Sequence, residues 1–148
     1  MKSTSFHRRK GQSAIEYLMT YGWMLLVVAI VGGAIFATVR GQCSKQNGLA
    51  STPVAIAEFG ATDTGLNLQI KNNKREQVTL NAVNITSDGT SIASQTGIGT
   101  TLRAGDTTSV SFPAITSSDA CTSYDVEIEY TAGVAQQVSG TIKDKMSS

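Results

Sequence analysis

The pattern of apolar residues divides the chain into two parts that predict different elements. Tyr17–Val39 is a predominantly apolar run without a single charged residue. A helix over this segment would be about 35 Å long, which exceeds the hydrocarbon core of a bilayer, roughly 30 Å thick. Because lipid offers no water to satisfy backbone polar groups, such a segment crosses a membrane as a helix. The first part is therefore predicted to be a transmembrane or otherwise wholly apolar helix.

From about Pro53 onward apolar residues alternate with polar ones, which is the pattern of half-buried strands. The clearest examples are Leu66–Ile70 and Tyr124–Tyr130, in which every second residue is apolar. The phase changes between Ala82 and Val83, which predicts a β-bulge or a strand buried on both faces. Turn-forming residues separate the predicted strands: Asp63-Thr64-Gly65, Ser87-Asp88-Gly89, Ala104-Gly105-Asp106 and Ala132-Gly133. About seven such strands predict an antiparallel β-sandwich.

These patterns place the chain in the α+β class. A long N-terminal apolar helix is expected to precede a C-terminal antiparallel, immunoglobulin-like β-sandwich that forms a head domain. At 148 residues the chain has room for one ordinary domain and an appendage. The predicted divisions are a basic leader at 1–11, the apolar helix at 12–42, a polar connector at 43–52 and the β-domain at 53–148.

The charges are distributed unevenly around the apolar run. Charged residues make up only 16% of the chain, and a basic cluster without any acid lies before Gly11. This cluster consists of Lys2, Arg8, Arg9 and Lys10. Basic residues on one flank of a membrane helix mark its cytoplasmic side, so the segment after Arg40 is expected outside the cell. We interpret the cluster as a targeting signal and expect no nucleic-acid binding, because no basic or aromatic surface follows it.

The residues needed for common catalytic chemistry are scarce. The only histidine is His7, which lies within the predicted leader. A mature chain without imidazole lacks Ser-His and Cys-His catalysis and the commonest zinc ligand. Asp125, Glu127 and Glu129 could bind calcium, but no matching loop accompanies them, and a solvated strand face is the preferred interpretation. We therefore expect no enzymatic activity, no catalytic residue, no metal and no cofactor.

The two cysteines, Cys43 and Cys121, lie too far apart in the sequence for a metal or redox motif. In an exported chain a single pair of this kind predicts a disulfide, which would pin the end of the helix to the β-domain. The alternative is two independent reduced thiols. Asn84-Ile85-Thr86 is an N-x-Thr sequon, so glycosylation at Asn84 is predicted. A chance match, with Ile85 directed into the core, is the alternative.

Two features of the apolar helix suggest more than a simple anchor. Ala29, Gly33 and Ala37 recur every fourth residue, and a ridge of small residues lets helix backbones approach closely. Glu16 places a carboxylate at the start of the apolar segment, which is costly unless the group is paired or lies at the interface. A solvated Glu16 that favours the helix dipole is the simpler interpretation.

The string RRKGQSAIEYLMTYGW, followed by the apolar run, resembles the class III signal peptide of archaeal type IV pilins. The family pattern is a basic leader, a Gly before the cut, a Gln-like first mature residue and an acid at mature position five. These elements correspond to Arg9 and Lys10, Gly11, Gln12 and Glu16. The resemblance covers roughly residues 8–39 and implies cleavage between Gly11 and Gln12 by a membrane prepilin peptidase.

The resemblance further implies a structural subunit of an archaeal type IV adhesion pilus, a helical polymer with its N-terminal helices in the core. Its partners would be other copies, the prepilin peptidase, a pilus assembly ATPase and its membrane platform. In bacterial relatives the acid corresponding to Glu16 is thought to meet the amino group of a neighbouring subunit. That amine would belong to Gln12, and cyclisation of Gln12 to pyroglutamate would abolish its charge and leave Glu16 to other roles.

Three alternatives stay open. The chain could be a minor pilin-like surface protein that binds a ligand, or a subunit of an archaellum-type swimming filament. It could also be an ordinary secreted protein, cut after the apolar run at Gly32-Gly33-Ala34. The predicted location is an extracellular filament at the cell surface, with a precursor held in the cytoplasmic membrane, its N-terminus inside.

Overall fold

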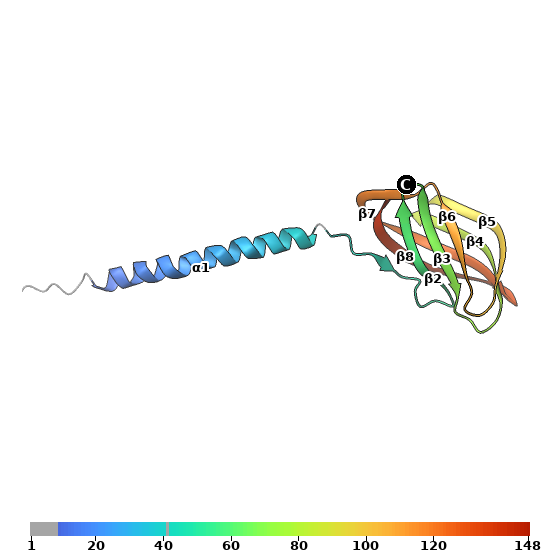
Figure 1. The fold of residues 1–148 in the computed structure, drawn as a ribbon, viewed down its shortest axis with the longest axis horizontal. Coiled ribbons are helices and arrows are strands. Elements are labelled where there is room, and N and C mark those ends of the chain that lie inside the picture. Colours follow the sequence, from blue (N-terminus) through green and yellow to red (C-terminus); the bar gives the residue numbers. More distant parts are fainter. Residues whose placement is uncertain (1–8, 41) are drawn as a thin grey trace, which may run out of the picture. The chain divides into compact units, whose positions relative to one another are not determined.

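The computed structural model describes residues 9–40 and 42–148 and divides into two units, with the boundary between Gln42 and Cys43. The first unit contains the helix α1 (Arg9–Arg40), and the second is a β-domain (Figure 1). The expected α+β architecture of one apolar helix followed by an antiparallel β-domain is confirmed. The helix begins at Arg9 instead of residue 12, inside the predicted leader, and His7 and Arg8 lie outside the described residues.

Eight strands form the β-domain, and all of their pairings are antiparallel. They are β1 (Gln46–Asn47), β2 (Val54–Thr62), β3 (Gly65–Asn72), β4 (Val78–Ser87), β5 (Thr90–Leu102), β6 (Thr107–Phe112), β7 (Thr116–Ala132) and β8 (Val134–Ser147). A five-stranded sheet has the order β1-β8-β7-β4-β5, and a three-stranded sheet has the order β2-β3-β6 (Figure 1).

The core is formed by the apolar phase of the alternating segments. Leu66, Leu68 and Ile70 of β3 are fully buried, and so are Val126 and Ile128 of β7. They belong to one cluster that takes residues from both sheets. The predicted alternation is therefore confirmed in both strands, because one face of each sheet packs against the other sheet while the second face stays polar.

The phase change predicted in the fourth strand is a β-bulge. The register of β4 shifts between Leu80 and Ala82 against both of its neighbours, β5 and β7. Ala82 and Val83 are both buried as a result. The extra residue, Asn81, donates a hydrogen bond from Nδ2 to Thr131 Oγ1 at 2.8 Å.

The turns that were predicted at glycine-containing segments are also present. Asp88 and Gly89 form the two-residue turn between β4 and β5, with φ angles of 50° and 78°. Two successive positive φ angles fit the twist of a tight hairpin and suit an Asp-Gly pair. Gly65 has φ +147°, and a Cβ there would lie 2.9 Å from the Phe112 carbonyl oxygen, so this position requires glycine.

The segment expected to be a polar connector, residues 43–52, is instead part of the β-domain. It contains β1, and Leu49 within it is fully buried in the core. The Gly48 amide donates to the Thr141 carbonyl at 2.9 Å, and a Cβ on Gly140 would lie 2.8 Å from Leu49 Cγ. A single large apolar residue among polar ones creates no periodic pattern, so the burial of Leu49 could not be predicted from the pattern.

Candidate functional site

The surface of α1 is apolar on every side. The stretch Ser13–Thr38 is long and apolar enough to cross a membrane, and every side chain in it is exposed. The Thr20 hydroxyl donates to the Glu16 carbonyl at 2.9 Å, and the Thr38 hydroxyl donates to the Ile35 carbonyl at 2.8 Å. These polar groups are therefore satisfied within the helix. A helix without a polar face suits lipid or a bundle of similar helices, because either surrounds it completely with apolar groups.

The small residues of α1 leave parts of its surface recessed. A Cβ added to Gly22, Gly32 or Gly33 would meet nothing within 4 Å. A shallow depression of about 440 Å³ lies beside Gly22 and is lined by Tyr17, Leu18, Tyr21, Gly22, Met24, Leu25 and Val28. The Tyr17 and Tyr21 rings lie side by side there, with centroids 4.2 Å apart. The predicted ridge of Ala29, Gly33 and Ala37 lies farther along the helix, whereas this depression lies closer to the N-terminal end.

The predicted cleavage pair, Gly11 and Gln12, lies in the first turns of α1. Glu16 follows one turn later, and its side chain is exposed. Helical geometry places residues 12 and 16 on neighbouring turns of the same face. The role of Glu16 in assembly, and those of Ala29, Gly33 and Ala37, involve a second copy of the chain and stay predictions.

Cys43 and Cys121 form a disulfide, as predicted, with Cα atoms 5.5 Å apart. Cys121 lies in β7 directly after a large bulge, because Ser117 pairs with Met146 and Cys121 already pairs with Lys145. The bond therefore attaches the chain just beyond α1 to β7. This strand pairs along most of its length with β8 and along part of it with β4.

Lys45 holds the same segment by polar contacts. Its Nζ atom donates to the Phe59 carbonyl oxygen and lies 4.5 Å from the centroid of the Phe59 ring. Asp144 Oδ2 is 3.8 Å from the same ammonium. The exposed pair contributes little by itself. Together with β1, buried Leu49 and the disulfide, however, it keeps the start of the β-domain in place.

The sequon lies on the outward face of the five-stranded sheet. Val83 and Ile85 are buried, so Asn84 and Thr86 point away from the core. Asn84 Oδ1 accepts a hydrogen bond from Ser94 Oγ at 2.6 Å. Ile85 is directed into the core, as the alternative interpretation anticipated, but this orientation is also what turns both polar sequon residues outward.

A shallow pocket of about 350 Å³ lies beside Asn84 and Thr86 of the sequon. Its lining consists of Asn84, Thr86, Ser91, Asp125, Val126, Glu127 and Ser139. Asp125 Oδ1 accepts from Thr141 Oγ1 at 2.9 Å, so the acid is partly satisfied by its own sheet. No group of three or more His, Cys, Asp or Glu side chains that could hold a metal occurs among residues 9–40 and 42–148.

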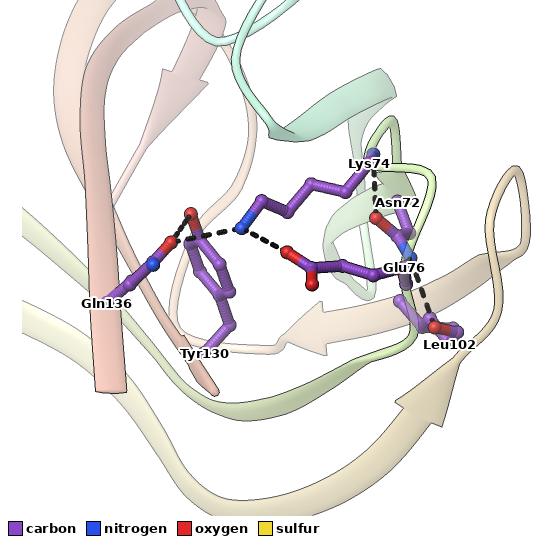
Figure 2. Close-up of polar contacts among 6 residues, drawn as sticks. All are labelled: Asn72, Lys74, Glu76, Leu102, Tyr130 and Gln136. Carbon is purple, nitrogen blue, oxygen red and sulfur yellow. Dashed lines mark hydrogen bonds and ion pairs between the residues drawn. The ribbon is translucent and has the colours of Figure 1, made fainter. Parts of the chain in front are cut away.

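Asn72 organises a second polar cluster, at the loop between β3 and β4 (Figure 2). It is the only polar residue classed as buried in the described part of the chain. Its Nδ2 donates to the carbonyl oxygens of Glu76 at 2.8 Å and Leu102 at 3.1 Å. Its Oδ1 accepts from the Lys74 amide at 2.9 Å. All three bonds go to backbone groups, so Asn72 ties the loop to the end of β5.

Lys74 connects this loop to the hairpin of β7 and β8 (Figure 2). Its Nζ lies 2.9 Å from Glu76 Oε1 and donates to Gln136 Oε1 at 3.3 Å. The Tyr130 hydroxyl donates to the same Gln136 oxygen at 2.8 Å. The hydrogen bond with Glu76 raises the pKa of the Lys74 amine above its ordinary value. A lysine held protonated serves as a structural cation and is a poor nucleophile or base.

This cluster was not predicted, although the sequence contains a signal for it. Asn72 continues the phase of Leu66, Leu68 and Ile70, so it is a polar residue at a position that the alternation assigns to the core. A buried amide costs free energy unless it is hydrogen-bonded. A polar residue in the apolar phase, next to a loop, therefore indicates a side chain that satisfies backbone groups.

Comparison with protein-family models finds none that matches the chain, and no curated protein matches it significantly. The fold and its surfaces thus define the class: an α+β protein with one exposed apolar N-terminal helix and a disulfide-bonded, two-sheet β-domain.

Proposed function

We propose that the protein is a structural pilin subunit that polymerises through α1 into an archaeal type IV adhesion pilus. The observation that carries the proposal is the exposed, all-round apolar surface of Ser13–Thr38, with Glu16 near its N-terminal end. Such a surface can exchange lipid for the helices of other copies, since both environments are apolar. The subunit would be cut between Gly11 and Gln12 and would leave the membrane as it joins the filament at the cell surface.

The assignment of the β-domain as an immunoglobulin-like sandwich belongs to the same proposal, and the strand order supports it. With β2–β8 lettered A–G, the sheets contain A-B-E and D-C-F-G. Constant-type immunoglobulin domains have A-B-E-D and C-F-G. The two arrangements differ in the sheet that takes strand D, here β5, and in the additional short strand β1 beside strand G.

The mature N-terminus tests this function most directly. We expect mass spectrometry of protein sheared from cells to find a chain that begins at Gln12, as the free amine or as pyroglutamate. A chain that begins at Ile35 would show ordinary secretion with loss of the helix, and would refute the filament. Abundance in sheared filaments also separates the major structural subunit from a minor ligand-binding one, and a motility assay after deletion tests the archaellum alternative.

Replacing Glu16 tests its role in assembly. A carboxylate at the edge of an apolar helix is costly without a partner, so the proposal gives Glu16 a partner on a neighbouring subunit in the filament. Glu16→Ala removes this contact between subunits. We therefore expect the variant to form no filaments in negative-stain microscopy, while the protein still accumulates in the membrane. Glu58→Ala is the matched control, because Glu58 is an exposed acid on β2. Normal filaments from Glu16→Ala would exclude an assembly role for this residue.

Glycosylation at Asn84 is also part of the proposal, supported by the outward orientation of Asn84 and Thr86 on the sheet. We expect the tryptic peptide containing Asn84 to carry a glycan that the Thr86→Ala variant loses. Thr79→Ala serves as the control, since Thr79 is also half-buried on β4 but lies outside the sequon. An unmodified wild-type peptide would refute the modification.

A further inference from the structure

Two open edges of the five-stranded sheet contain no charged residue. β5 forms one edge, and residues 134–139 of β8 form part of the other, because β1 and the adjoining Gly48–Leu49 segment lie beside β8 at residues 140–143 and leave 134–139 uncovered. Neither of these edge segments contains Asp, Glu, Lys, Arg or Pro. Exposed edges usually carry such residues, since unpaired N–H and C=O groups otherwise invite pairing with another strand.

The charges of β8 lie outside its stretch 134–139. Lys143 pairs with β1, and Asp144 and Lys145 follow it, whereas the stretch 134–139 reads VAQQVS and has no strand paired on its outer side. Val134, with 64% of its surface exposed, stands at the start of this uncovered stretch and is the one large apolar residue of 42–148 that is classed as exposed. The open part of the edge is therefore both neutral and partly apolar.

The opposite edge offers a short regular stretch. In β5, Ala93–Thr96 pair continuously with β4, between a register shift beside Ile92 and another that spans Gly97–Gly99. Bulges bend an edge strand, so only Ala93–Thr96 and their immediate neighbours present a straight ladder. Ile92 and Val138, one on each edge strand, are core residues that stay partly exposed.

Strand direction makes these two edges fit each other. β8, β7, β4 and β5 alternate in direction, so β5 of one copy would lie antiparallel to β8 of a neighbouring copy in the same orientation. The edges of the three-stranded sheet could not pair antiparallel between copies in the same orientation, because β2 and β6 run in the same direction. Copies joined there would form the slightly weaker parallel ladder.

We propose that β5 of one copy pairs with residues 134–139 of β8 in a second copy. The partner is another copy of this chain because one domain supplies both complementary edges, and because neutral edges bring no like charges together. A contact between two different surfaces is heterologous, and where its rotation does not close into a ring it propagates as an open polymer. The inference rests on the proposed function for the common orientation of the copies, and it adds a lateral contact between β-domains to the packing of α1.

Crosslinking of the full-length protein in intact cells tests this contact. The native cysteines are joined to each other, so thiols introduced by Gln95→Cys on β5 and Gln137→Cys on β8 would be the reactive ones. With a flexible thiol-to-thiol crosslinker we expect the double variant to give a ladder of dimers, trimers and higher oligomers. Each single variant should stay monomeric, since the contact joins unlike edges. Ser109→Cys with Gln137→Cys is the control, because Ser109 is exposed on β6 of the other sheet.

Each outcome separates the edge contact from the filament itself. Filaments without a ladder would refute edge pairing and leave the proposed function intact. A ladder without filaments would support the contact and refute the pilus. Dimers from Gln95→Cys alone would show a two-fold contact between identical edges and would overturn the proposal. The absence of both ladder and filaments would refute both.

Discussion

Removal of the disulfide is expected to lower the free energy of unfolding by about 4–5 kcal/mol, through the substitutions Cys43→Ser and Cys121→Ser together. The bond closes a loop between residues 78 positions apart, and a loop of this length strongly limits the freedom of the unfolded chain. Urea unfolding followed by circular dichroism measures the change. Reduced wild-type protein is the control, because it loses the same crosslink and keeps both cysteine residues.

A loss below about 1 kcal/mol would contradict this expectation, since that is the scale of a single ordinary interaction.

The position of the bond adds a mechanical consequence. Cys43 precedes β1 in the chain, so tension that arrives from α1 reaches β7 through the disulfide before it reaches β1. β7 pairs with both β8 and β4, whereas β1 comprises two residues. We expect the double variant to lose β1 and Leu49 from the domain first, detected as faster amide hydrogen exchange at residues 46–49.

Replacement of Asn72 by alanine is expected to destabilise the β-domain by roughly 2–4 kcal/mol. The substitution leaves the Glu76 and Leu102 carbonyls and the Lys74 amide without the side chain that pairs with them. Because Asn72 is fully buried, water cannot easily replace those bonds. Thermal unfolding measures the loss.

Asn73→Ala is the matched control for this variant. The neighbouring Asn73 is exposed and makes one hydrogen bond from its side chain, to the Thr52 carbonyl at 3.1 Å. A substitution there should cost less than about 1 kcal/mol, because solvent can replace the bond. Equal effects at positions 72 and 73 would show that burial of the amide is unimportant and would contradict the role assigned to Asn72.

The features of this chain that rest on a repeated local pattern were predictable from the sequence. The apolar run predicted α1, and the alternation of Leu66–Ile70 and Tyr124–Tyr130 predicted both the strands and their buried faces. The phase change near Ala82 predicted either a bulge or a strand buried on both faces, and β4 contains the bulge. In each case several residues, alternating with a period of two or forming an unbroken apolar run, support the same assignment of the element.

Single residues were predicted less well. Leu49 is fully buried in a segment that looked like a polar connector, and Asn72 is fully buried although it is polar. One apolar residue among polar ones has no period, and one polar residue in an apolar phase looks like a break in the strand. Both acquire their roles from partners that are distant in the sequence, Gly140 and Leu102.

The sequence by itself thus determined the type of each main element, the buried face of its clearest strands and the presence of one pair of cysteines. Only the tertiary structure decided which strands became edges, that β1 pairs with Ile142 and Lys143 of β8, and that Cys43 meets Cys121 at a bulge of β7. The physical reason is that burial has a local period along a strand, whereas strand order depends on contacts summed over the whole core. The neutral edges of β5 and β8 are visible as edges only once that order is known.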